Sequence, residues 1–482
     1  MRNTDDFPQQ EMGVNKKILD LALPSILANI TVPLVGMVDI AVAGHLDPSS
    51  VASAATLIGG VAIGTMLFDL LYWNFGFLRV GTGGLTAQAF GRGDMKESAS
   101  ILSRAVGIAL LCSLLLLAVQ WLFVKAAFLV VDCTPEVREL ASGYFYIRIW
   151  ASPATLSLMA FKGWFIGMQD SISPMVTDLV VNVVNTAASI VLALGFTAGG
   201  YSWEGIGFTG IAAGTVMAQY SGLLCAGILL LVKYRRRVFQ GWRPGDIFKA
   251  FGGAEMKRFF VMNTDLFIRS LCFIGIYIGF TTFSAHYGDL LLASGTILMK
   301  IMMLFSYFTD GFAYAGEALT GRYIGARDRD TLMKVVKFVF VWSLGIGVGF
   351  MFLYAFAGLP ILKVMTEDYQ VIDMSLKYMP WMVLMPLLGC AAFAWDGIYI
   401  GATASRPIRN TMIAAAAGFF LTYFAGLGIL RAVAPPDADS SVLAIHVLLA
   451  AYLIHLVIRT VYLTVRFRKD IVSRVACSAP SR

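Results

Sequence analysis

The chain has 482 residues, of which 58% are hydrophobic and 14% are charged, with a formal net charge of +7. Soluble globular proteins carry about 25% charged residues, so this composition excludes an ordinary soluble domain and predicts a protein that crosses a membrane several times. The modest positive charge fits basic loops that face anionic lipid, and we expect no nucleic-acid partner. The six cysteines lack paired spacing and the four histidines are scattered, which disfavours a disulfide framework and a metal site.

A helix needs about 20 mainly apolar residues to cross a bilayer. Twelve stretches meet this requirement, in chain order 18–45, 51–78, 100–128, 138–162, 174–197, 206–232, 256–285, 290–320, 332–358, 370–397, 408–432 and 441–466. Lys and Arg gather in alternate connections between them, for example Lys16 with Lys17 and Arg235 to Arg237. The positive-inside rule then predicts a multi-pass protein of the cytoplasmic (inner) membrane with both termini in the cytoplasm.

Two motifs recur at one spacing. GRGD at 91–94 matches GARD at 325–328, and GWFIGMQDS at 163–171 matches GIYIGATAS at 397–405; both pairs are 234 positions apart. This predicts an N-lobe (1–232), a cytoplasmic linker (233–255) and a C-lobe with a cytoplasmic tail (256–482). The expected fold class is an all-α polytopic membrane protein, with two six-helix lobes related by a pseudo-two-fold axis.

Asp39 lies in the apolar stretch TVPLVGMVDIAVAGHL (31–46), with no Lys or Arg within one or two turns of its own helix. A charge at membrane depth usually faces a cavity or a partner, which favours ion coupling; the alternative is a solvated place at the outer end of the helix. Pro24 and Pro33 lie in the same stretch, and each removes a helical hydrogen bond. We therefore expect this helix to bend when a nearby charge changes.

The stretch VNVVNTAAS (181–189) puts Asn182, Asn185 and Ser189 on one helix face, and Thr215 can join them. With a carboxylate, these oxygens would hold a proton-linked network or a sodium ion. Ordinary hydrogen bonding between helices explains the same residues, and the sequence leaves both interpretations open.

Other charges in the apolar stretches form pairs by spacing. Asp310 and Glu317 share a face three turns after Lys300, and they fit either a structural network or a substrate contact. Asp265 and Arg269 stand at i, i+4, which is the spacing of an ion pair.

Three further charges have partners that the sequence does not fix. Arg79 is expected to neutralise Asp69 or a carboxylate of a neighbouring helix. Lys162 and Asp396 occupy equivalent positions of the repeat with opposite charge. They suit either a salt bridge across the pseudo-axis or separate places at the cytoplasmic boundary.

Several stretches resemble the multidrug and toxic compound extrusion family, in its DinF-like branch. They are LALPSILANITVPLVGMVDIAVAGHL, YWNFGFLRVGTGGLTAQAFGRGD, YFYIRIWASP, GWFIGMQDS, DGFAYAGEALTGRYIGARD and WDGIYIGATAS. The resemblance covers nearly the whole chain. It implies twelve helices in two lobes and export of drug-like compounds, driven by entry of protons or sodium ions.

The resemblance also assigns roles to residues. It implies that Asp39, Asn185 and Thr215 form the ion-coupling site and that the first helix bends near Pro24. Ser189 departs from the family pattern, because an aspartate is common there. The loss of that negative charge weakens the case for sodium and leaves single-carboxylate proton coupling intact. Cys272 and Gly389 stand where a related branch has C-lobe carboxylates, so a sodium site is not evident there either.

The sequence thus predicts a secondary active antiporter, not an enzyme, that exports organic compounds in exchange for protons, with sodium as the less favoured ion. We expect drug-like substrates, contact with membrane lipid, no cofactor and a monomer. A flippase or exporter of lipid-linked or polysaccharide precursors is the main alternative, with Arg79, Arg269 and Lys300 as candidate cations for a pyrophosphate. A membrane enzyme would need a nucleophile–base pair or metal cluster, and a channel fits the repeat less well.

Overall fold

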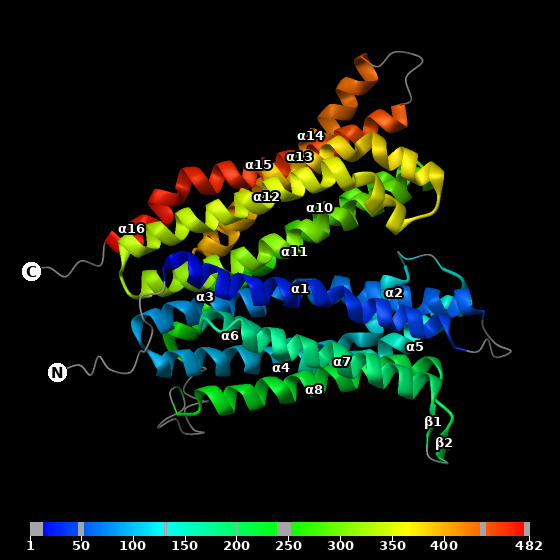
Figure 1. The fold of residues 1–482 in the computed structure, drawn as a ribbon, viewed down its shortest axis with the longest axis horizontal. Helices are drawn as coiled ribbons and strands as arrows, with labels where there is room; N and C mark the ends of the chain where they lie inside the picture. Colours follow the sequence, from blue (N-terminus) through cyan, green and yellow to red (C-terminus); the bar gives the residue numbers. More distant parts are fainter. Residues whose placement is uncertain are drawn as a thin grey trace, which may run out of the picture. The chain divides into compact units, whose positions relative to one another are not determined.

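The computed structural model describes residues 13–46, 53–129, 131, 133–198, 201–236, 238, 252–433 and 440–476. Over these residues the chain is nearly all helical, as predicted (Figure 1). The strands in the described part are β1 (Phe196–Ala198) and β2 (Tyr201–Trp203), which form an antiparallel hairpin between α7 (Ile172–Leu194) and α8 (Phe208–Tyr234).

The contacts divide the chain into two compact units. Unit 2 is Leu27–Gly275, and unit 1 combines Met1–Ile26 with Ile276–Arg482. The boundaries fall inside α1 (Val14–Gly44), two residues after Pro24, and inside α10 (Gly253–His286). The predicted lobes stay a prediction, and the linker predicted at 233–255 lies mostly outside the described residues.

The remaining helices of unit 2 are α2 (Ala54–Trp73), the 3-10 turn η1 (Asn74–Gly76), α3 (Phe77–Arg92), α4 (Met95–Ala127), α5 (Pro135–Arg148), the 3-10 turn η2 (Ile149–Ala151) and α6 (Ser152–Gly167). Those of unit 1 are α11 (Asp289–Gly325), α12 (Arg329–Met365), α13 (Tyr369–Gly401), α14 (Ser405–Val433), α15 (Ser440–Phe467), the π-helical turn η3 (Arg468–Val472) and α16 (Ser473–Ala476).

Among the described residues, 11 helical stretches are long and apolar enough to cross a membrane. The twelfth predicted stretch, 138–162, falls on α5, η2 and α6. There α5, η2 and α6 follow one another without a gap, so the 3-10 turn lies within one helical run, as η1 does between α2 and α3. Pro153 stands at the start of α6 and lacks the N–H that would continue the α-helical ladder.

The repeat reappears in the backbone. Gly93 and Arg327, which are 234 positions apart, both have positive φ angles, of 74° and 60°. Gln169 and Thr403 form a second such pair, with φ of 62° and 51°. Each marks the end of a helix at the same place in the two units, so the matching motifs are matching helix ends.

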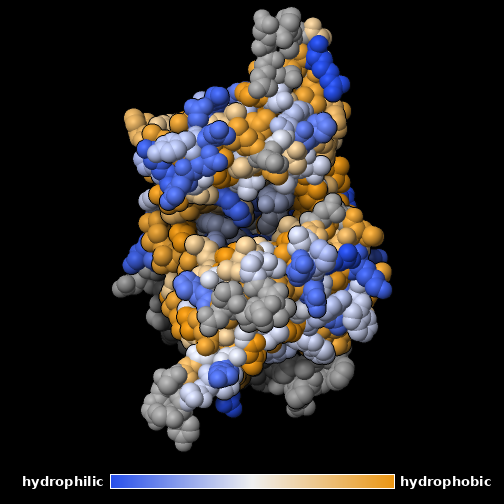
Figure 2. Space-filling view, turned by 90° about the vertical axis from the view of Figure 1, so that its right-hand side faces the viewer, coloured by the Kyte–Doolittle hydropathy of each residue, from blue (hydrophilic) through white to orange (hydrophobic). Residues whose placement is uncertain are grey.

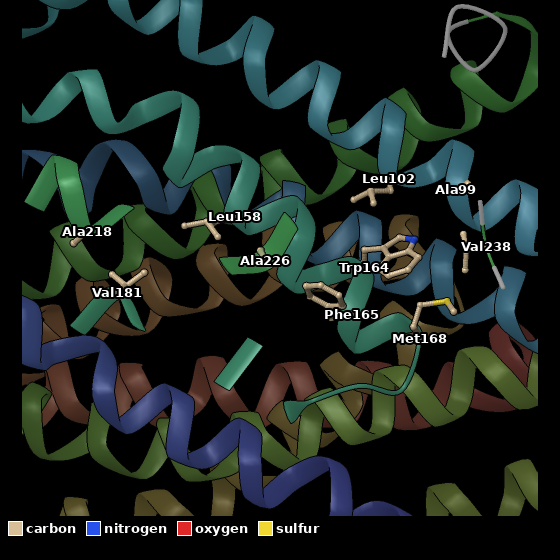
Figure 3. Close-up of a cluster of buried hydrophobic side chains, with 10 residues drawn as sticks. All are labelled: Ala99, Leu102, Leu158, Trp164, Phe165, Met168, Val181, Ala218, Ala226 and Val238. Carbon is tan, nitrogen blue, oxygen red and sulfur yellow. The ribbon is translucent and has the colours of Figure 1, made fainter. Parts of the chain in front are cut away.

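The core of unit 2 includes a cluster of buried side chains from α4, α6, α7 and α8 (Figure 3). Trp164 lies in it and donates from its indole nitrogen to the carbonyl of Ser98 over 2.9 Å. Outward, α4 exposes Leu111, Leu115 and Leu122 on one side. Figure 2 shows apolar side chains over wide areas of the surface, as expected where lipid is the solvent.

One polar cluster joins helix ends of unit 2. Asp170, between α6 and α7, accepts hydrogen bonds from Ser173 and from Lys233 and Tyr234 at the end of α8. Burial by itself raises the pKa of Asp170, but the hydrogen bonds from Ser173 and Lys233 outweigh it and hold that pKa below its usual value. These basic helix ends therefore lie together at one end of the unit.

Candidate coupling site

Asp39 lies on the second half of α1 and is 0% exposed. Its Oδ2 accepts from the Tyr144 hydroxyl over 2.8 Å and from the Thr215 hydroxyl over 3.0 Å. Its Oδ1 accepts from Asn185 Nδ2 over 3.2 Å and from the Ser189 hydroxyl over 3.4 Å. The structure thus brings Asp39, Asn185, Ser189 and Thr215 together, and it ties α1 to α5, α7 and α8.

Small residues allow this close approach. A Cβ on Gly214 would overlap Ser189, and a Cβ on Gly64 would overlap the ring of Tyr144. The two glycines lie on α8 and α2. Without side chains there, α7 packs tightly on α8 and the Tyr144 ring lies against α2. These contacts fix the direction from which each donor reaches the carboxylate.

Tyr144 and Arg148 are site residues that the sequence reasoning missed. The Arg148 Nη1 donates to the Tyr144 hydroxyl over 2.9 Å and lies 3.3 Å from the Thr65 hydroxyl. Asp39 therefore has a basic neighbour, but on α5 and not on its own helix. The signal was a tyrosine and an arginine four residues apart within an apolar stretch, since such residues share one helix face.

The four neighbours of Asp39 named above are all hydrogen-bond donors to its carboxyl group. A carboxylate offers about four acceptor positions, and here it meets three hydroxyls and one amide N–H group. Asn182, which was expected on the same face, instead donates to the carbonyl of Asp178 on its own helix. Asp178 itself contacts Lys162 in a salt bridge, so its carboxylate serves a different contact.

Pro24 lies half-buried on α1, which is helical through both Pro24 and Pro33. Nearby hydroxyls bond to carbonyls of the same helix: Ser25 to Leu21 over 2.8 Å and Thr31 to Ala28 over 2.7 Å. The helix is thus unbroken at both prolines, and its bending near Pro24 stays a prediction.

The other predicted charges of unit 2 lie elsewhere. Asp69 is exposed on α2, and its charge acts on Arg148. Arg79 is half-buried near the start of α3. Asp265, 3% exposed, and Arg269 stand one turn apart on α10. Their expected pairings, Asp69 with Arg79 and Asp265 with Arg269, stay predictions.

In unit 1, Lys300 is exposed, Asp310 is half-buried and Glu317 is 0% exposed, all on α11. Asp396 on α13 forms a 2.7 Å salt bridge with Arg459 of α15, and Arg459 is 3% exposed. Lys162, its counterpart in the repeat, pairs with Asp178 inside unit 2. Each of these two charges thus has a partner of opposite charge within its own unit.

Fold and site together define an all-helical, multi-pass membrane transporter built on a repeat. The profile of the MatE family matches residues 24–191 and 266–434, and the chain belongs to this family, whose members are transporters and not enzymes. The chain is similar to the DNA damage-inducible protein F of Escherichia coli (strain K12), with 33% identity over 408 residues that cover 85% of each chain.

More distant relatives agree with this assignment. A probable multidrug resistance protein NorM of Thermotoga maritima is 23% identical over 370 residues, which cover 77% of this chain and 76% of that one. The crystal structure of the Vibrio cholerae MATE transporter VcmN in the bent form superposes with a TM-score of 0.75 at 14% identity and covers 96% of this chain and 98% of that one. At that identity the superposition shows a shared fold.

Proposed function

We propose that this protein is a secondary active antiporter that exports organic, drug-like compounds across the cytoplasmic membrane in exchange for protons. The observation that carries the proposal is the buried Asp39 carboxylate with its four hydrogen-bond donors from three other helices. The name of the Thermotoga relative, a probable multidrug resistance protein, supports the substrate class.

Protonation of Asp39 provides the switch. The ionised carboxylate binds its donors through charge-assisted hydrogen bonds, which are stronger than neutral ones. A proton on Asp39 weakens these bonds and releases α1 from α5, α7 and α8. The helix then bends near Pro24, where the proline has already removed a backbone hydrogen bond. The bent form reported for the Vibrio cholerae transporter of this fold fits such a step.

Antiport follows if proton and substrate favour different conformations of the same chain. The proton binds the bent form better, and the organic substrate binds the straight form better. Proton entry from outside then drives release of the substrate to the outside, and loss of the proton to the cytoplasm resets α1.

The donor set favours a proton over a sodium ion. Sodium needs several oxygen ligands, preferably anionic ones, and Ser189 replaces a carboxylate with a hydroxyl. Among the hydrogen-bond partners of Asp39 described above, each presents a hydrogen to the carboxylate. Such a shell binds an anion, so the small cation that it accepts most easily is a proton bonded to the carboxylate itself.

The flippase alternative is less well supported. A pyrophosphate would need cationic side chains that are not already neutralised. Of the cations considered for it, Arg269 stands one turn from Asp265 on α10, and Lys300 shares α11 with Asp310 and Glu317, so acids accompany these positions. Arg148 donates to the Tyr144 hydroxyl, which in turn donates to Asp39.

The proposal is tested with purified protein in liposomes. Export of a fluorescent organic cation is measured under an imposed proton gradient and, separately, under a sodium gradient. We expect Asp39→Asn to lower the proton-driven rate by at least about tenfold. Asp20→Asn, an exposed change on the same helix, is the matched control and retains the rate. Wild-type rates in Asp39→Asn would refute the coupling role, and transport driven by sodium alone would refute the choice of ion.

A further inference from the structure

Arg148 is held in place from several directions. It is half-buried at the end of α5, and its Nη1 lies 2.9 Å from the Tyr144 hydroxyl and 3.3 Å from that of Thr65. Its guanidinium also lies over the Phe68 ring, 4.9 Å from the centroid, and 5.5 Å from the centroid of the Tyr144 ring. Stacking on aromatic faces and a fixed donor fork restrict the side chain to one orientation.

This placement decides the direction of the next hydrogen bond. A guanidinium has donors and no acceptor, so the Tyr144 oxygen accepts from Arg148. The single Tyr144 proton is then free to point at Asp39 Oδ2, 2.8 Å away. The chain from Arg148 through Tyr144 to Asp39 is therefore aligned toward a negative charge at its end.

We propose that Arg148 is a positioning residue that acts on Asp39 through Tyr144, as the internal counter-ion that holds the carboxylate ionised and sets the external pH at which the switch operates. This inference rests on the proposed function. Removal of the guanidinium would take a positive charge away from the Tyr144 hydroxyl that donates to Asp39, so the carboxylate would take up its proton at a higher pH.

Other groups of the described residues act on this chain of hydrogen bonds. Asp69 and Tyr72 of α2 act electrostatically on Arg148, together with Asp39 and Tyr144. Asp69 is exposed, whereas Asp39 is buried. From α7 and α8 the residues bonded to Asp39 are the neutral Asn185, Ser189 and Thr215.

The test reads the protonation of Asp39 directly. Infrared difference spectra of the protein in liposomes are recorded against pH, and the carboxyl band of Asp39 is identified by its loss in Asp39→Asn. We expect Arg148→Gln to move the midpoint of this band upward by about one pH unit. Arg148→Lys keeps the charge and moves it less. Arg138→Gln, an exposed arginine of the same helix over the Phe128 ring, leaves it in place.

A double-mutant cycle tests the route through Tyr144. Tyr144→Phe removes the linking hydroxyl, so Arg148→Gln should move the midpoint less in that background than in wild type. An unchanged midpoint in Arg148→Gln would overturn the proposal, and so would equal shifts in both backgrounds. If Arg148→Gln does not fold, the shifts of the Asp39 band midpoint in Arg148→Lys and in Tyr144→Phe decide whether the proposal holds.

The two proposals fail in different ways. If Asp39→Asn still transports like wild type, the coupling function fails, yet the band midpoint still reports whether Arg148 holds Asp39 ionised. If Asp39→Asn is inactive but the band midpoint is the same in Arg148→Gln as in wild type, only the counter-ion inference fails. With both proposals correct, the pH profile of transport in Arg148→Gln moves in the same direction as the band.

Discussion

Asp39 and Asp396 are both buried acids, and their surroundings differ in kind. Asp396 contacts the guanidinium of Arg459 directly over 2.7 Å. Asp39 instead accepts from neutral groups, and Arg148 lies behind the hydroxyl of Tyr144. A direct buried ion pair resists protonation because its partner would be left charged and alone. The two acids therefore differ in their contacts: Asp396 meets a charged partner directly, and Asp39 meets neutral donors.

The buried salt bridge between Asp396 and Arg459 predicts an effect on stability. Asp396→Asn leaves Arg459, which is 3% exposed, without its carboxylate. We expect a loss of about 3–5 kcal/mol in the free energy of unfolding. The matched control is Asp373→Asn on the same helix, because the Asp373–Lys377 pair is exposed and such pairs contribute below about 1 kcal/mol. Thermal unfolding in detergent measures both. Equal losses for the two variants would mean that the buried pair has no special weight.

Among the elements, α3 and α6 show how glycines set helix packing. A Cβ on Gly163 of α6 would overlap the carbonyl oxygen of Arg79 on α3. In the other unit, a Cβ on Gly397 would overlap the carbonyl oxygen of Ala313, and both residues are 234 positions further along. The same close crossing therefore occurs twice, since only glycine leaves room for the neighbouring backbone. The repeated glycines of the sequence motif have this packing role.

This crossing can be tested with one methyl group. Gly163→Ala forces α6 away from α3, and we expect it to destabilise the protein by about 1–3 kcal/mol. Gly143→Ala on α5 adds the same group where nothing lies within 4 Å, so helix propensity makes it neutral or stabilising by up to about 1 kcal/mol. Melting temperatures of the two variants in detergent give the comparison. If Gly163→Ala and Gly143→Ala have the same melting temperature, the close approach of the two helices does not limit stability.

For the whole molecule, the arrangement of helix ends in unit 2 predicts its orientation in the membrane. Asp170 and Lys233 join the start of α7 to the end of α8, while the β1–β2 hairpin connects the opposite ends of the same helices. The 23 residues of α7 separate the two ends by about 34 Å, which is the thickness of a bilayer core. The basic ends then lie in the cytoplasm and the hairpin lies outside.

Labelling tests this orientation in intact cells, with the native cysteines replaced. A membrane-impermeant maleimide should label Ser202→Cys, an exposed position on β2, without permeabilisation. It should label Lys96→Cys, exposed near the start of α4, only after the membrane is opened. The reverse pattern would invert the topology, and labelling of both from outside would refute the assignment of the two ends to opposite sides.

Much of this protein follows from local sequence. Apolar length predicts the helices, and the 234-residue spacing predicts the repeat, because bilayer thickness and helix-end chemistry act on short stretches. The isolated Asp39 and the resemblance also point to Asn185, Ser189 and Thr215. The 3-10 turn at Ile149–Ala151 also has a local signal, since Pro153 follows it after Ser152.

Only the tertiary structure decided the partners of each charge. Arg148 and Tyr144 join Asp39 from a helix about 100 residues away, and Arg459 rather than Lys162 meets Asp396. Spacing along one helix shows which residues share a face but not which face of another helix it meets. That choice depends on the packing of glycines and side chains around the whole unit, and it is what brings Arg148 to the Tyr144 hydroxyl that donates to Asp39.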